Sequence, residues 1–227
     1  MKATYYGHST FSLDLEGAQI LFDPFISPNP LAAAVEVGHL KPDYILLSHA
    51  HADHVADLFT IQAQSEAEVV AIVETATWVR RNGVSEDKVL EMNIGGTLQA
   101  RFGWAKMVIA IHTNATPDGA YGGQAAGYLV GSGGKTIYYA GDTALTSDMQ
   151  FIRAYRPDLV FLPIGGHYTM DVQDALLAAQ LIGCKRVVGM HYNTFPPISI
   201  DTAEAKRLFQ EAGIDLILPA IGDSIPV

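Results

Sequence analysis

Three histidines and an aspartate within six residues are the strongest chemical signal in this sequence. His49, His51, Asp53 and His54 form the stretch HAHADH directly after the apolar segment Tyr44 to Ser48. Imidazole and carboxylate groups ligate transition metals, and their alternating spacing does not suit one face of a helix. A chain that leaves a strand and turns into a helix could instead spread these side chains around two neighbouring ions. The stretch therefore predicts a metal site.

Further residues of ligand type follow other apolar segments. If these segments are strands that lie side by side and end at one edge of a sheet, their side chains meet HAHADH there, because ligand sites favour the carboxyl ends of strands in such sheets. A single histidine after a strand is usually an ordinary loop residue, and His39 is interpreted in that way. The recurrence of the pattern is what carries the prediction. The downstream candidates are His112, Asp142, His167 and His191.

Seven ligands are more than one tetrahedral zinc ion uses. They fit two divalent ions, one held by three imidazoles and one by Asp53, His54 and His191, with Asp142 as a bridge. Zinc is the first choice, and manganese, iron or nickel are alternatives because the same ligands accept several ions. Two ions ~3.5–4 Å apart can share a hydroxide, since metals lower the pKa of water from ~15.7 towards ~7. This chemistry predicts hydrolysis of an ester, lactone, amide or phosphodiester.

Composition limits the function classes. The 227 residues include 24 acidic and 14 basic ones, for a net charge of -10. This balance argues against a nucleic-acid partner and favours a small-molecule substrate, while a homo-oligomer stays open. The only cysteine, Cys184, allows no disulfide within the chain and is expected to be buried and inert.

No apolar segment approaches the ~18 residues of a membrane span, and residues 1–6 read as a strand, not a signal peptide. We therefore expect a cytoplasmic protein. No linker divides the sequence, which predicts a single hydrolase domain over residues 1–227.

Short apolar segments alternate with helical ones, which predicts an α/β (α+β) fold with mixed β-sheets flanked by helices. Strands are expected at 1–6, 10–15, 18–22, 43–47, 69–73, 89–92, 97–102, 104–111, 126–130, 136–140, 159–163, 186–190 and 214–218. Helices are expected at 55–65, 75–82, 147–155, 171–181 and 201–212.

The seven ligand candidates resemble, in identity and order, the HxHxDH–H–D–H pattern of the metallo-β-lactamase superfamily. Other stretches resemble its UPF0173-type metal-dependent hydrolases, near the ascorbate-6-phosphate lactonase branch. These are residues 7–11, 23–25, 139–143, 163–166, 168–170 and 191–196. The resemblance implies a four-layer αββα sandwich with two metals at one edge. It also implies one metal on His49, His51 and His112, a second on Asp53, His54 and His191, and Asp142 between them.

Three residues are catalytic candidates. Asp53 would orient the metal-bridging hydroxide or accept its proton. His8, in a Gly-His-Ser turn, would support the site or face the substrate, with a structural hydrogen bond as the alternative. His167 would donate to a substrate oxyanion or protonate a leaving group. Tyr168 and Tyr192 either line the pocket or pack against the loops, and the loop from Pro24 to His39 is either a lid, an oligomer contact or a packed surface segment.

Three other functions remain open. One is a phosphodiesterase or nuclease of the same fold, against which the acidic balance counts. Another is an iron-dependent oxidoreductase resembling the persulfide dioxygenases. The related flavodiiron pattern is not expected, because it usually has Glu at the position of His51 and an appended flavin domain, for which a chain ending at Val227 leaves no room. The last is a non-catalytic metal-binding protein.

Overall fold

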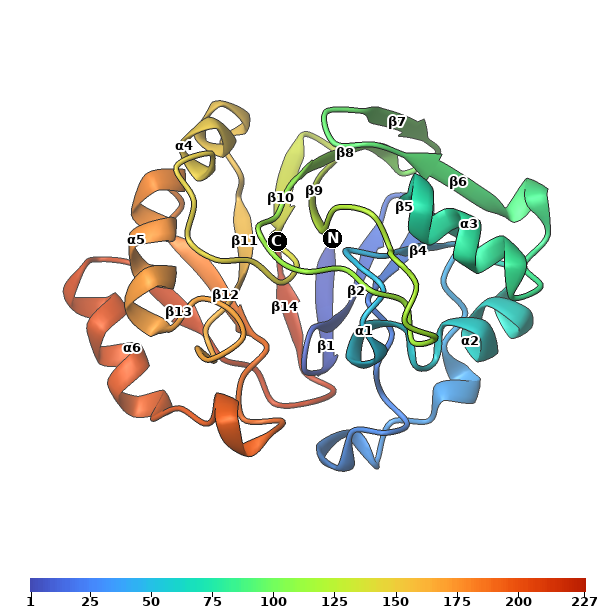
Figure 1. Ribbon diagram of the computed structural model, residues 1–227. Helices are drawn as coiled ribbons and strands as arrows, with labels where there is room; N and C mark the ends of the chain where they lie inside the picture. The colour runs from blue at the N-terminus through green and yellow to red at the C-terminus, as the bar shows by residue number, and fades with distance from the viewer.

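Two seven-stranded β-sheets lie face to face between layers of helices in the computed structural model, which describes residues 1–227 (Figure 1). Helices α1 to α3 cover the sheet formed mainly by the N-terminal half, and α4 to α6 lie on the side of the second sheet (Figure 1). This arrangement confirms the expected four-layer αββα sandwich.

The first sheet has the strand order β14-β1-β2-β3-β4-β5-β6. Strands β1 to β3 pair antiparallel, and β3 to β6 pair parallel, so the sheet is mixed. Its last member, β14, returns from the C-terminus to pair with β1. The strands are β1 (Lys2–Gly7), β2 (Thr10–Leu15), β3 (Ala18–Phe22), β4 (Tyr44–Leu46), β5 (Glu68–Ile72), β6 (Val89–Met92) and β14 (Ser224–Pro226).

The second sheet has the order β13-β12-β11-β10-β9-β8-β7. Strands β7 to β10 pair antiparallel, and β10 to β13 pair parallel. The strands are β7 (Thr97–Ala100), β8 (Gly103–Ile109), β9 (Ala126–Ser132), β10 (Lys135–Tyr139), β11 (Leu159–Pro163), β12 (Arg186–Met190) and β13 (Asp215–Ile217).

Two expected helices are interrupted. The helix expected over 55–65 is divided at Asp57, whose carboxylate accepts hydrogen bonds from the backbone N–H groups of Ile26 and Ser27. The one expected over 147–155 is a short α-helix followed by a 3₁₀ turn that ends at Arg156, which has a left-handed φ of 48°. The α-helices are α1 (Ala52–Val55), α2 (Leu58–Ser65), α3 (Val73–Arg81), α4 (Met149–Ile152), α5 (Val172–Ile182) and α6 (Thr202–Glu211).

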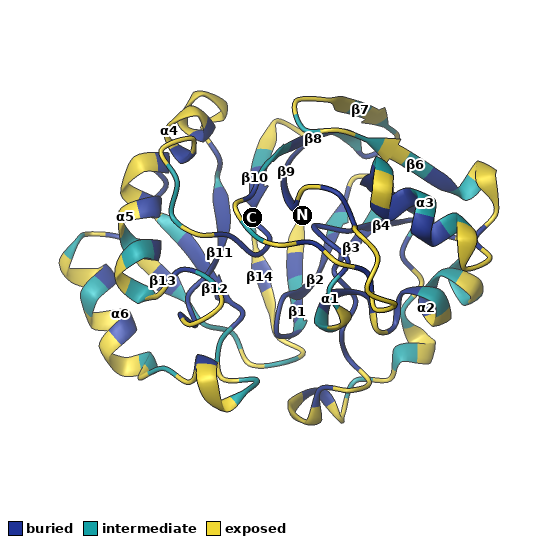
Figure 2. Cartoon of the chain, viewed as in Figure 1, coloured by how far each residue is buried: buried dark blue, intermediate teal, exposed yellow.

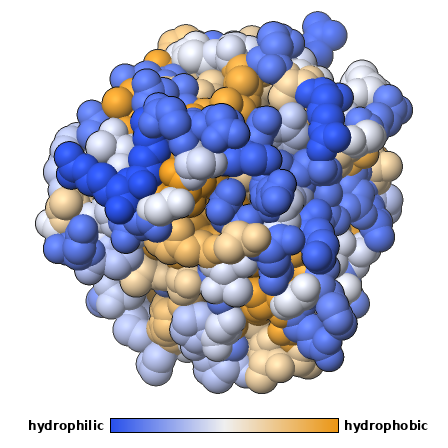
Figure 3. Space-filling model, turned by 90° about the vertical axis from the view of Figure 1, so that its right-hand side faces the viewer, coloured by the Kyte–Doolittle hydropathy of each residue, from blue (hydrophilic) through white to orange (hydrophobic).

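Aromatic side chains join the two sheets in the core. Phe22 of β3 stacks on Tyr139 of β10 with ring centroids 4.3 Å apart, and Phe11 of β2 meets Phe161 of β11 at 4.7 Å. Such pairs contribute about 0.5–1.5 kcal/mol beyond their burial. The central strands are buried, whereas β6, β7 and β14 at the sheet edges and the outer faces of the helices are partly or largely exposed (Figure 2). The side that carries α2 and α3 is mostly hydrophilic, with smaller apolar patches (Figure 3).

The loops that follow the carboxyl ends of several strands bring the candidate residues to one edge of the sandwich. Asp23 follows β3, His49 follows β4, Asp142 follows β10 and His191 follows β12. Loops from both sheets cross there (Figure 1), so the site is shared between the sheets. The longest helix, α5, has 11 residues, and none of the helices combines the length and the apolar character needed to cross a bilayer.

Candidate metal centre

Three histidines from two sheets form the first group of ligand atoms. His49 follows β4, His51 precedes α1, and His112 lies beyond the end of β8; their ligand atoms all lie within 4.8 Å of one another. Nε2 of His49 is 3.0 Å from Nδ1 of His51. The backbone N–H between them, that of Ala50, donates to the side-chain oxygen of Asn114, which holds the HAHADH turn against the loop of His112.

A second group contains Asp53, His54, His191 and, in addition, His8, again with all ligand atoms within 4.8 Å of one another. Asp142 lies between the two groups. Its Oδ2 is 3.0 Å from Nε2 of His191, 3.4 Å from Nε2 of His54 and 3.7 Å from Nε2 of His112. The structure thus brings together all seven residues that the sequence singled out as ligands.

Two buried atoms test whether this arrangement suits a cation. Nε2 of His54 and Oδ1 of Asp142 have no hydrogen-bond partner, although neither is accessible to solvent. An unsatisfied buried polar atom costs about 1–3 kcal/mol, and nearly all such atoms in proteins have partners. Both are atoms that a divalent cation accepts as ligands, so the donor set fits metal ions.

Asp23 is a functional candidate that the sequence reasoning did not assign. Its buried carboxylate accepts hydrogen bonds from the backbone and hydroxyl of Ser48 and from the hydroxyl of Tyr139, and it lies 2.9 Å from Nδ1 of His54. A carboxylate on the second ring nitrogen orients a metal-binding histidine. Asp23 therefore fixes the His54 ring with Nε2 directed towards Asp142. Asp23 directly follows a strand, as several of the ligands do, and this position in the sequence could have identified it as a candidate.

His8, the additional member of the second group, is buried. Its Nε2 is 3.3 Å from Oδ2 of Asp53, and its Nδ1 is 3.0 Å from the hydroxyl of Thr194. The His8 ring centroid lies 4.2 Å from that of His191, and the His8 carbonyl accepts the backbone N–H of His191. His8 thus contacts two of the predicted ligands directly.

His167 lies differently from the other candidates. It is exposed, its backbone has a left-handed φ of 57°, and its ring contacts that of Tyr168 at 4.5 Å between centroids. It belongs to neither ligand group. Tyr168 is also exposed, whereas Tyr192 is half-buried.

Other residues interpreted from the sequence lie outside the ligand groups. His39 is exposed and pairs with Glu36 at 3.1 Å, which agrees with an ordinary loop residue. The thiol of Cys184 is buried and donates to the carbonyl of Arg186, as expected for an inert cysteine. In the loop from Pro24 to His39, Ile26 and Ala32 are buried in a hydrophobic cluster beneath α2 and α3, so part of this loop is packed onto the protein.

The pKa values of the buried histidines at the site shift in opposite directions. Burial lowers the pKa of His8 to about 4, with the hydrogen bond to Asp53 acting in the other direction. Burial also acts to lower the pKa of His54, but the charges of Asp142 and Asp23 outweigh it and raise that pKa well above its usual value. Burial acts to raise the pKa of Asp142, yet the charges of His191 and His54 hold it well below its usual range. Metal binding must therefore displace a proton from His54.

These shifts predict that the metal-free protein is most stable near neutral pH. Below pH 6.5 His8 takes up a proton in the unfolded chain but stays neutral in the folded protein. The free energy of unfolding therefore falls between about pH 6.5 and 4, by about 3 kcal/mol from His8 alone. Above pH 6.5 the unfolded chain releases the His54 proton while the folded protein keeps it, so stability falls with rising pH up to the raised pKa of His54. Guanidinium unfolding of chelated protein from pH 4 to 8 measures the profile. His8→Gln should make the acid side less steep, although the lowered pKa values of His49, His51 and His112 keep some of the slope, and His39→Ala should leave it unchanged. A flat wild-type profile would contradict the prediction.

With the geometry established, comparison with known proteins identifies the family. Residues 18–192 match the family model described as "Beta-lactamase superfamily domain". The chain is 44% identical to a "UPF0173 metal-dependent hydrolase" of Methylacidiphilum infernorum, over 99% of each chain. It is 43% identical to a relative of the same description from Thermus thermophilus, over 95% of this chain and 94% of that one.

A solved structure gives the same answer. The structure of Igni18, described as a novel metallo hydrolase from Ignicoccus hospitalis KIN4/I, superimposes with a TM-score of 0.88 at 36% identity, covering 99% of this chain and 97% of that chain. Fold and sequence together define a member of the metallo-β-lactamase superfamily. Within it, the chain belongs to the UPF0173 metal-dependent hydrolases. The nearness to the ascorbate-6-phosphate lactonase branch stays a prediction.

Proposed function

We propose that this single-domain hydrolase uses two divalent metal ions, zinc in the first place, to cleave an ester, lactone or phosphodiester bond in a small molecule. The observation that carries the proposal is the position of Asp142. Its Oδ2 lies within 3.7 Å of ring nitrogens from both ligand groups. A carboxylate in that position suits a bridge between two ions, with His49, His51 and His112 on one and Asp53, His54 and His191 on the other.

When bound, two ions supply a water of lowered pKa and positive charge for the substrate oxygen. The side chains around them define the proton path. Asp53 is 29% exposed, whereas Asp142 and His54 are almost inaccessible, so Asp53 is the carboxylate of the site that solvent and substrate reach. Burial acts to raise its pKa, but the hydrogen bond from His8 and the charge of His54 lower it, which keeps Asp53 ionised. Asp53 would orient the nucleophilic water and accept its proton, while His8 holds its carboxylate in place.

Metal content in matched variants tests this proposal. His49→Ala should remove one ion of two and His191→Ala the other, because each leaves the opposite group intact; His39→Ala, an exposed histidine outside the groups, should retain both. Metal per chain is measured by emission spectrometry, and turnover on a panel of esters, lactones and phosphodiesters. Two ions retained in both site variants would refute the two-metal assignment. Fully loaded wild-type protein without turnover on the whole panel would refute hydrolysis of these substrates.

A further inference from the structure

The segments around the ligand groups contain no lysine or arginine. All 14 basic residues of the chain lie on other segments, while the site segments carry only acidic residues and histidines as ionisable groups, apart from tyrosines. These site segments lead from the strand ends into the ligand groups and their neighbouring loops. They are residues 23–40, 47–57, 110–125, 140–148, 164–171 and 191–201.

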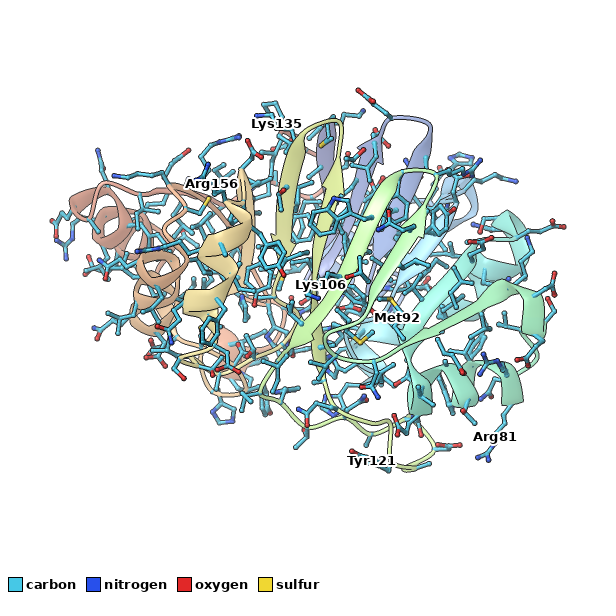
Figure 4. The ribbon with its side chains drawn as sticks, turned by 90° about the horizontal axis from the view of Figure 1, so that it is seen from above. Arg81, Met92, Lys106, Tyr121, Lys135 and Arg156 are labelled. Atoms are coloured by element: carbon cyan, nitrogen blue, oxygen red, sulfur yellow. The ribbon has the colours of Figure 1, made fainter.

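Several of the basic residues lie at the opposite ends of the same strands. Lys41 precedes β4, Lys135 begins β10 and Arg186 begins β12, whereas the ligands follow the far ends of these strands. Lys135 and Arg156 lie at one edge of the molecule, and Tyr121, in the loop that follows His112, lies at the other (Figure 4). These basic residues are thus at the opposite ends of their strands from the metal centre, whereas Arg81, at the end of α3, lies on the same side as Tyr121 (Figure 4).

Helix N-termini are the other common binding sites for phosphate, and those of α5 and α6, which follow the site loops, are already satisfied. In α5 the first free N–H groups, those of Gln173 and Asp174, donate to the side chain of Asp171. In α6 the equivalent groups donate to the side chain of Asp201. A phosphate at either helix would have to displace a carboxylate and face its charge.

Apolar side chains border the ligands instead. Ile111 directly precedes His112 and is 45% exposed, and Tyr168 is 55% exposed. Thr143, the residue after Asp142, joins both segments: its hydroxyl accepts the backbone N–H of Ile111, and its carbonyl accepts that of Met170. On the side of the second group, the half-buried ring of Phe195 lies 5.3 Å from the His8 ring.

We infer that the substrate is an uncharged carboxylic ester or lactone with an apolar group next to the scissile bond, and not a phosphate-bearing molecule. The inference rests on the proposed function. With two divalent ions bound, the carboxylates of Asp23, Asp53 and Asp142 and one hydroxide from water would balance the charge of the ions, so a further substrate anion would lack a partner. Recognition of a phosphate or carboxylate normally uses arginine or lysine, and a neutral apolar substrate needs neither.

The reaction balances without another reactant. The oxygen of water bonds to the carbonyl carbon, the bond from that carbon to the alcohol oxygen breaks, and the alcohol oxygen keeps the electron pair and takes a proton. The product acid then ionises and releases one proton.

Matched substrates test the inference. 4-Nitrophenyl butyrate and mono-4-nitrophenyl succinate share a leaving group and a similar acyl length but differ by one carboxylate. We expect kcat/KM to be roughly ten- to a hundredfold higher for the neutral ester. This is the usual effect when a charged group, here the succinate carboxylate, is bound without a partner of opposite charge. Bis(4-nitrophenyl) phosphate should be cleaved more slowly still. Ile111→Lys should reduce the preference by adding a cation beside His112, whereas Leu177→Lys, on the exposed face of α5, should leave it unchanged.

Binding separates this inference from the proposed function. N-(4-nitrophenyl)butanamide should bind the metal-loaded protein more tightly in calorimetry than its succinamic acid counterpart. Equal or tighter binding of the acid, no binding of the amide, or preferred cleavage of the succinate or phosphate ester would overturn the inference, even with hydrolysis intact. If no substrate were cleaved while the amide still bound preferentially, the proposed function would fail and the inferred ligand preference would stand.

Discussion

Replacing Asp142 by alanine is expected to lower kcat/KM by at least about a thousandfold and to leave fewer than two metal ions per chain. Asp142 is the carboxylate that contacts His54, His112 and His191 together. Without Asp142, no carboxylate lies between the two proposed ions, and the repulsion between their positive charges is not offset. Removal of the carboxylate also leaves the pKa of buried His54 without the charge that most strongly raises it, so the neutral form of this ring gains.

The control for Asp142→Ala lies in the same loop. Asp148 is exposed, and Asp148→Ala removes the same charge without touching the ligand groups, so turnover and metal content should stay at wild-type values. Far-ultraviolet circular dichroism checks that both variants are folded. An Asp142→Ala protein that is folded, fully loaded and active would rule out the bridging role of this residue.

Replacing Asp23 by alanine should have the largest effect on stability, a decrease of about 3–5 kcal/mol in the free energy of unfolding, as when one partner of a buried charged pair is removed. The change leaves donors of Ser48, His54 and Tyr139 without their acceptor inside the core. Loss of the hydrogen bond that orients His54 should also weaken metal binding by about 10–100-fold.

Asp23→Asn separates the two effects. The amide keeps the size and one acceptor oxygen, so the metal-free variant should unfold at a higher denaturant concentration than Asp23→Ala, while its weaker metal binding persists. Asp14→Ala removes an aspartate of β2 that pairs with Lys2 at the surface, and should change stability by less than about 1 kcal/mol. Denaturant unfolding with and without metal gives all of these values. A neutral Asp23→Ala would show that the buried network adjusts without the carboxylate.

The strand ends were predictable from the sequence because apolar segments stop where polar ligands begin. Strands β2, β3, β6, β11 and β12 have the predicted bounds, and β4, β8 and β10 differ from them by one or two residues at an end. The ends of β4, β8, β10 and β12 carried the prediction that HAHADH, His112, Asp142 and His191 meet. The same rule selected His167, whose place after β11 is as predicted. The left-handed turn and exposure of His167 depend on backbone angles in the Gly-Gly-His loop, which spacing does not reveal.

Contacts between distant segments could not be predicted. His8 and Thr194 are 186 residues apart and hydrogen-bond only because β1 and β12 end at the same edge. Asp23 belongs to residues 23–25, one of the stretches that resemble the UPF0173 hydrolases. Its role depends on contacts with Ser48, His54 and Tyr139, which come from both sheets. Strand β14 has three residues and ends in Pro226, too short for a period to be recognised. Pairing with β1 creates this strand, and no local preference predicts it.

The division of the centre between the two sheets has a consequence for biosynthesis. Synthesis proceeds from the N-terminus, so His49, His51 and His112 leave the ribosome before Asp142 and well before His191, and β14 follows last. A nascent chain can thus assemble the three-histidine group early, but the proposed second ion has its full ligand set only when the chain is nearly complete. If two ions bind as proposed, a chain that stops before His191 would present only the three-histidine group in full, and the second ligand set would form only after β12 is made.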